Sequence, residues 1–194
     1  YKNRGGRNHW SLICSCMDWI DIAIDYIVEQ PLNIEHIKTK CMQAYAYISA
    51  IDIVWQSIQQ LHKAIIDPKS TPFMGEKKVF ADNRVCNDDN EYFKHIRAVF
   101  GAHPVNLRKG GGKWYASWPT DFVYNQYDYS VILYSADVDQ ENIVFGYRFA
   151  ELDKFLYSRY NYLNTIIKEL DRQCKKPKDI NRSIRLDNES KSHQ

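Results

Sequence analysis

Residues 34–66 carry the pattern that most constrains how this chain can fold. Apolar side chains recur in this segment at alternating spacings of three and four residues. They are Ile34, Ile37, Cys41, Ala44, Ile48, Ile51, Trp55, Ile58, Leu61 and Ile65. The spacing predicts one helix that spans on the order of 50 Å and packs along partner helices at a shallow angle. A helix this long in a chain of 194 residues either kinks or projects far enough to form a dimer surface.

The preceding segment predicts an amphipathic helix over residues 12–30. Its apolar side consists of Leu12, Cys16, Trp19, Ile20, Ala23 and Ile27. Asp18, Asp21 and Asp25 fall on the other side, and we interpret them as a solvated acidic face. A carboxylate buried against a functional corner is the alternative. The same three aspartates exclude a membrane-spanning helix here.

A short third helix leads into the part of the chain where we expect chemistry. Asp88 is its predicted N-cap, and Glu91 three residues later completes a capping-box-like pair. Gly101 is predicted to end the helix as a left-handed residue. Pro104, three residues later, cannot continue a helix. Residues 67–87, which precede this helix, have no sustained period, and connections of this length are usually functional or mobile.

After residue 107 the pattern changes. Arg108 to Lys113 is interpreted as a flexible basic loop, and residues 129–135 and 142–148 are strand-like runs joined by a polar turn. A last amphipathic helix over residues 149–174 would close a helical core. The predicted fold class is therefore mainly α, a four-helix bundle with a small inserted β-hairpin.

These elements predict one domain between two tails. Residues 1–10 are expected to be a disordered N-terminal segment, and residues 177–194 a disordered C-terminal tail. Residues 11–176 form a single helical-bundle domain with a β insertion at about 113–148. His62 lies beside the apolar stripe and is interpreted as a partly buried structural histidine rather than a functional one.

Charge and cysteine content narrow the function classes. The formal net charge is +2, so only local clustering can argue for nucleic acid. The five cysteines form no CxxC pair and no disulfide framework, which favours a reducing, cytoplasmic compartment. No secretory signal or membrane span is visible. The spacing of histidines, cysteines and glycines predicts no metal site and no cofactor.

Arg97 and His103 are the residues on which a catalytic prediction can rest. Arg97 leaves the last turn of the third helix, and His103 follows the predicted glycine cap. A guanidinium offers a fixed fork of donors to phosphate oxygens, and a histidine can move a proton near neutral pH. The arginine would lower the histidine pKa and the negative helix end would raise it, so the net direction stays open.

The segment from Arg97 to His103, set within a four-helix pattern, resembles the HEPN domains. These are helical bundles, often dimeric, whose signature is Arg-x(4–6)-His near a helix end. Many are metal-independent ribonucleases of toxin, antiphage or RNA-processing systems. The resemblance covers roughly residues 10–176 and implies that Arg97 and His103 are catalytic. It also implies a homodimer, for which the helix at 34–66 could supply the contact, and a possible cognate antitoxin.

Basic and aromatic residues surround this corner. No acidic residue lies between Lys94 and Thr120. Basic side chains neutralise phosphates and exposed aromatic rings stack on unpaired bases, so single-stranded RNA is the expected partner. The candidate substrate contacts are Lys94, Asn106, Arg108, Lys109, Lys113 and Trp114. The alternative is a solvated basic loop whose tryptophans are packed in the core.

Three functions remain open. In the first, an endoribonuclease, His103 activates the ribose 2′-hydroxyl and Arg97 holds the scissile phosphate. The second is a non-catalytic HEPN-like module that contacts RNA, a nucleotide or a partner protein. Ala98 favours the second, because the family often has a polar residue directly after the arginine. Asn106 is the candidate to take the place of that residue. The third is a structural helical domain in which Arg97 and His103 only fix the helix end.

Overall fold

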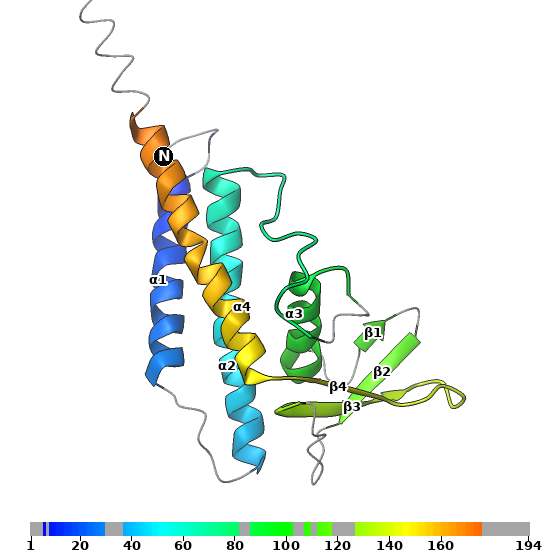
Figure 1. Cartoon of the computed structure of the whole chain (residues 1–194). Coiled ribbons are helices and arrows are strands. Elements are labelled where there is room, and N and C mark those ends of the chain that lie inside the picture. Colours follow the sequence, from blue (N-terminus) through cyan, green and yellow to red (C-terminus); the bar gives the residue numbers. More distant parts are fainter. Residues whose placement is uncertain are drawn as a thin grey trace, which may run out of the picture.

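The computed structural model describes residues 6, 8–29, 37–81, 86–102, 107–109, 112–117 and 127–175, with backbone alone at 37–40, 102 and 107–109. The helices are α1 (His9–Glu29), α2 (Ile37–Ile65), α3 (Asp89–Arg97), the π-helical turn η1 (Ala98–Ala102) and α4 (Phe149–Asn161). Helical backbone resumes over residues 163–175 after one turn residue. The strands are β1 (Leu107–Lys109), β2 (Gly112–Ser117), β3 (Tyr129–Ser135) and β4 (Ile143–Tyr147). The chain is thus mostly helical, and its sheet lies beside α3 at one end of the helices (Figure 1).

The long helix predicted at residues 34–66 is confirmed as α2, with described bounds Ile37–Ile65. It is one continuous helix, and α1 and α4 run beside it (Figure 1). The residues of the predicted stripe from Ala44 to Ile65 are all buried. From Ala44 to Ile65 the predicted stripe is therefore buried inside the protein, because α1, α3 and α4 pack against α2. Its exposed positions are Gln56, Gln60 and Lys63, together with Met42 (64% exposed) and Tyr45 (41%) nearer its start.

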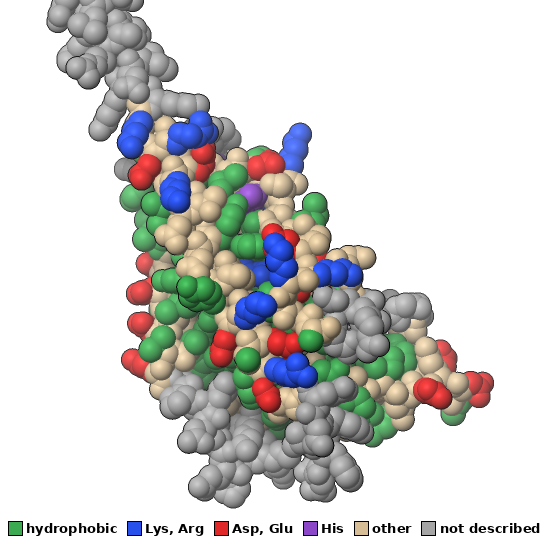
Figure 2. Space-filling model, in the orientation of Figure 1, with side chains coloured by type: hydrophobic (Ala, Val, Ile, Leu, Met, Phe, Trp, Pro, Cys, Tyr) green, Lys and Arg blue, Asp and Glu red, His purple; other side chains and the backbone are tan. Residues whose placement is uncertain are grey.

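The first helix is confirmed, with an earlier start than predicted. Asn8 accepts a hydrogen bond from the backbone N–H of Ser11 (3.1 Å), and α1 begins at His9, inside the segment 1–10 that we expected to be disordered. Asp18, Asp21 and Asp25 are exposed, as the interpretation of a solvated acidic face requires. Figure 2 shows acidic side chains in a row along the outer edge of α1.

The predicted hairpin is confirmed as β3 and β4, but it is half of a larger sheet. Four antiparallel strands follow one another in the order β1-β2-β3-β4. Lys109 pairs with Gly112 and Arg108 with Lys113, so the segment that we interpreted as a flexible basic loop contributes to two strands. The strand β1 was not predicted because it has only three residues, which are too few to show alternation.

The long connection before α3 is held by the carboxylates at the start of that helix. Asp88 is the N-cap of α3, as predicted, and its side chain accepts from the N–H of Glu91 (2.8 Å). The neighbouring Asp89 is buried and accepts from the backbone N–H groups of Lys78 (2.8 Å) and Val79 (3.1 Å). These bonds attach the described part of the connection to the helix that carries the candidate site.

His62 is a structural histidine, as predicted. Its side chain is 4% exposed, and its ring nitrogens lie 2.8 Å from the Tyr162 hydroxyl and 2.8 Å from the Ser70 hydroxyl. Burial lowers the pKa of His62 from its usual 6.5, which favours the neutral ring.

Among the described helices, none combines the length and the apolar character that a bilayer crossing requires.

Candidate functional site

The end of α3 differs from the predicted glycine cap. The helix passes at Ala98 into the π-helical turn η1, and Gly101 lies within this turn without a positive φ. A Cβ atom on Gly101 would meet two ring carbons of Tyr45 at 2.7 Å. The glycine is therefore required for close approach between this turn and α2 rather than for a left-handed backbone. His103 comes directly after this turn in the sequence and lies outside the described residues.

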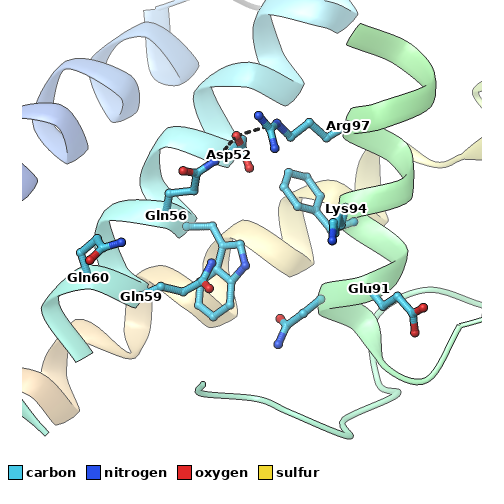
Figure 3. Close-up of a pocket in the computed structure, with 10 residues that line it drawn as sticks. Asp52, Gln56, Gln59, Gln60, Glu91, Lys94 and Arg97 are labelled. Atoms are coloured by element: carbon cyan, nitrogen blue, oxygen red, sulfur yellow. Dashed lines mark hydrogen bonds and ion pairs between the residues drawn. The ribbon is translucent and has the colours of Figure 1, made fainter. Parts of the chain in front are cut away.

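Arg97 reaches from the last turn of α3 to a carboxylate on α2. Its Nε lies 2.8 Å from Oδ2 of Asp52, and the arginine side chain stays 45% exposed. Gln56 donates to the same Oδ2 at 2.7 Å. Burial raises the pKa of Asp52, and the charge of Arg97 and the hydrogen bond from Gln56 oppose this rise. Figure 3 shows the three side chains meeting between the two helices.

These residues line a groove of about 530 Å³ between α2 and α3. Its lining residues are Asp52, Trp55, Gln56, Gln59, Gln60, Asn90, Glu91, Phe93, Lys94 and Arg97. The charged members balance formally, but in Figure 3 Glu91 points away from α2. Arg97 and Lys94 are therefore the cations at one end of a groove whose other end carries uncharged amides.

A buried arginine fixes the floor of this groove. Arg159 of α4 is 2% exposed, and its guanidinium carbon lies 3.9 Å from the ring centroid of Phe155 and 5.6 Å from that of Trp55. Its Nη2 donates to Oδ1 of Asn90 at 2.9 Å. Burial lowers the pKa of Arg159 to about 10, so the side chain stays charged at neutral pH. The cation holds the rings beneath the groove in one arrangement.

The predicted substrate contacts divide into three groups. Lys94 lines the groove, and Lys113 is exposed on β2. Arg108 and Lys109 lie on β1, described by backbone alone, and Asn106 lies outside the described residues with His103. Trp114 is 4% exposed and packs in the core, so its ring offers no free face to a base. This matches the alternative interpretation, a tryptophan tucked into the core.

Two tyrosines that are not among the candidate substrate contacts occupy the outward side of the sheet. Tyr115 and Tyr134 are cross-strand partners, 38% and 41% exposed. Side chains alternate along β2, so Tyr115 faces outward where Trp114 faces inward. The Nζ of Lys113 lies 5.4 Å from the ring centroid of Tyr115. The alternation of the sequence at residues 113–115 is the signal that could have identified Tyr115.

The α2 side of the groove was also missed. Asp52, Gln56, Gln59 and Gln60 recur at spacings of four, three and one, on the side of α2 that borders Trp55 of the apolar stripe. Polar residues on the exposed side of a long helix ordinarily form a solvated face. For this reason the four polar residues did not indicate a function in the sequence. Only the packing of α3 alongside α2 shows that they face Arg97.

Within the described ranges no group of three or more histidine, cysteine or acidic side chains could hold a metal ion. Comparison of the chain with protein-family models, with curated proteins and with solved structures gives no match. The interpretation of the site therefore depends on its own geometry and on the resemblance of Arg97 and His103 to the HEPN signature.

Proposed function

We propose that the protein is a metal-independent endoribonuclease of HEPN type. The observation that carries the proposal is the position of Arg97, which stands at the end of α3 over a polar groove, half-exposed, six residues before His103. Lys94, one helical turn earlier, lines the same groove and adds a second cation for a phosphodiester.

In the proposed reaction His103 removes the proton of the ribose 2′-hydroxyl, and the 2′-oxygen attacks the adjacent phosphorus. The bond from phosphorus to the 5′-oxygen of the next nucleotide breaks, and this oxygen takes up a proton from the protonated histidine or from water. The products are a 2′,3′-cyclic phosphate and a 5′-hydroxyl end. Arg97 stabilises the negative charge that develops on the phosphate oxygens.

The sheet supplies a second contact for single-stranded RNA in this proposal. Tyr115 and Tyr134 are cross-strand partners, 38% and 41% exposed, and Lys113 adds a positive charge. Aromatic faces stack on bases of any identity, and nearby cations neutralise the backbone. Tyr115 and Tyr134 thus replace Trp114 as the stacking residues.

The test uses the wild-type protein with Arg97→Ala and His103→Ala variants. We expect single-stranded RNA to be cleaved in excess chelator by the wild type, and cleavage to fall by at least about a hundredfold in either variant, because each removes a group that acts in the transition state. Lys63→Ala, an exposed cation on α2 outside the groove, is the matched control. Cleavage that persists in both variants, or that requires a divalent metal, would reject the mechanism.

A second candidate is a non-catalytic module that binds RNA or a nucleotide at the same groove. The Arg97–Asp52 ion pair favours it, because the arginine already has an anionic partner. Ala98 packs against the core and offers no polar group to orient a histidine. RNA binding without turnover, weakened by salt and unchanged in His103→Ala, would identify this function.

The remaining proposals follow from the resemblance. We propose a homodimer, a cytoplasmic location and a role in defence or toxicity with a possible antitoxin partner. Since the apolar stripe of α2 is used inside the chain, the self-association surface that we propose is α1, where Met17, Trp19 and Ile22 are 60%, 51% and 61% exposed. Light scattering of the wild type and of a Trp19→Asp variant decides this point: a wild-type monomer would contradict it.

A further inference from the structure

The groove between α2 and α3 extends well past the cations, and its far end has a chemistry that phosphate binding does not explain. Along α2 it runs from Asp52 to Gln60, more than two helical turns or about 12 Å. Arg97 and Asp52 meet at one end, and Gln59 and Gln60 lie at the other (Figure 3). A ligand that fills the groove must combine an anionic group with an uncharged polar group.

The side-chain amides of the groove are not equivalent. The amide of Gln56 donates to Asp52 at 2.7 Å. Asn90 uses both of its polar atoms, accepting from Arg159 at 2.9 Å and donating to the carbonyl of Pro72 at 3.1 Å. In the described part of the chain, neither Gln59 nor Gln60 has a side-chain hydrogen bond. These two glutamines are therefore the amides that can bind a ligand.

Between the two ends the floor is apolar and rigid. Trp55 and Phe93 line the groove although they are only 4% and 1% exposed, so both are held in the core beneath it. Trp55 makes edge-to-face contacts with Phe155, 6.1 Å between ring centroids, and with Phe73, 6.0 Å between ring centroids. A floor of this kind suits a planar ring that lies between the amides and the cations.

We propose that this groove is a nucleotide-binding pocket that holds a phosphate at Arg97 and Lys94 and reads the base with Gln59 and Gln60. A carboxamide carries a donor and an acceptor side by side, as the Watson–Crick edge of a base does. The volume of about 530 Å³ falls within the range of about 300–1,000 Å³ that small-molecule sites occupy.

The proposal deepens the proposed function and rests on it, because it gives the ribonuclease a base preference at the nucleotide bound beside Arg97. The ligand chemistry is that of a nucleoside monophosphate, either free or as one unit of an RNA strand. Both sources present the same phosphate and the same base edge, so they are separated by experiment.

The experiment is calorimetric titration of the full chain with the four nucleoside monophosphates, with inorganic phosphate and with short oligoribonucleotides of single composition. We expect one monophosphate to bind at least about tenfold more tightly than phosphate. A Gln59→Ala/Gln60→Ala double variant should lose that advantage and keep its affinity for phosphate. Arg97→Ala should weaken all ligands. Gln140→Ala, an exposed amide beyond β3, is the matched control.

The outcomes separate the two proposals. If all four monophosphates and all oligonucleotides bind no better than phosphate, or if the double variant keeps its base preference, the pocket is rejected, even where RNA is cleaved through His103. If a base preference depends on the glutamines but no RNA is cleaved, the pocket stands and the nuclease proposal fails. If the oligonucleotides show a base preference and the free monophosphates show none, the site is assigned to RNA rather than to a free nucleotide.

Discussion

At the scale of single residues, Arg97 has a carboxylate partner inside the protein before any RNA binds. Oδ2 of Asp52 lies 2.8 Å from Nε of Arg97, and the side chain of Asp52 is only 15% exposed. A bound phosphate must share the guanidinium with this carboxylate or displace it. The ion pair therefore orients the arginine and at the same time weakens its attraction for a second anion.

This competition predicts the effect of Asp52→Asn. The amide keeps an acceptor for Arg97 and removes the negative charge, so single-stranded RNA should bind about two- to fivefold more tightly, or about 0.5–1 kcal/mol. Fluorescence anisotropy of a labelled RNA measures the change. Asp18→Asn, an exposed aspartate on α1, controls for net charge. Weaker binding in Asp52→Asn than in the control would show that Asp52 positions Arg97 rather than competing for it.

His62 predicts a pH dependence of stability. Its folded pKa lies below the value of 6.5 in the unfolded chain, so as pH falls through 6.5 the unfolded state takes up a proton first. The contribution of His62 to stability is present above pH 6.5 and is lost as pH falls toward the folded pKa. Urea unfolding at several pH values measures this loss.

The matched variant is His62→Gln. At pH 7.5 it should be about 1–2 kcal/mol less stable than the wild type, because hydrogen bonds to Tyr162 and Ser70 are weakened. Its stability should fall less than that of the wild type between pH 7 and pH 5. Parallel pH profiles for the two proteins would mean that the ring gains its proton in the folded state as readily as in the unfolded state.

At this scale the sequence marks Arg97 and Lys94 as candidates but not the side chains that line the groove with them. Charge and residue type alone mark a cation as a candidate, whereas Asp52 and Gln59 become candidates only through the packing of α3 on α2. Trp114 shows the opposite failure. Its ring was a plausible stacking residue by type, and the strand alternation that buries it was not used.

At the scale of elements, β4 depends on a glycine whose missing side chain leaves room for two neighbours. A Cβ on Gly146 would lie 2.5 Å from the ring of Tyr127 and 2.5 Å from the backbone oxygen of Tyr129. Gly146→Ala should therefore lower the free energy of unfolding by about 2–3 kcal/mol, measured by denaturant titration.

The ring of Tyr127 and the backbone oxygen of Tyr129 would each clash with the added Cβ atom. Adding Tyr127→Ala to Gly146→Ala should restore little stability, because the oxygen of Tyr129 belongs to the paired strand β3 and cannot move away. An unchanged midpoint in Gly146→Ala, or full recovery in the double variant, would contradict this account of β4.

The outward side of the sheet makes a separate prediction about RNA. Tyr115→Ala and Tyr134→Ala should each weaken single-stranded RNA binding by about 1–3 kcal/mol, since each would remove one stacking surface. Tyr157→Ala is the matched control, because Tyr157 is 71% exposed on α4. Equal affinities for the three variants and the wild type would remove the sheet from the RNA interface.

Element type was predictable wherever a period lasted several turns. The apolar spacing gave α1, α2 and α4, and the strand-rich runs gave β3 and β4. The end of α3 was not predictable in this way, because Gly101 followed by Pro104 reads as an ordinary helix stop. The chain instead continues as a π-helical turn in which Gly101 lies close to Tyr45 of α2, a residue that is far from it in the sequence.

At the scale of the whole molecule, the helical bundle brings residues from distant parts of the sequence to one groove. α2 supplies the polar wall, α3 supplies the cations, and Arg159 of α4 fixes the floor. The four-helix architecture followed from the sequence, because each helix needs the others to bury its apolar side. The small sheet was underestimated, because the strand-like runs predicted β3 and β4 but neither β1 nor β2.

In the reaction that we propose, Arg97 and His103 use the RNA 2′-hydroxyl as the nucleophile. The most direct measurement is cleavage, in excess chelator, of an RNA that carries a single 2′-deoxynucleotide at a mapped cleavage site. We predict that cleavage stops at this position alone, while neighbouring sites are cut to cyclic phosphate ends and the affinity of the strand is unchanged. Cleavage that continues at the deoxy position, or an absence of cleavage in the all-ribose strand, would contradict the claim.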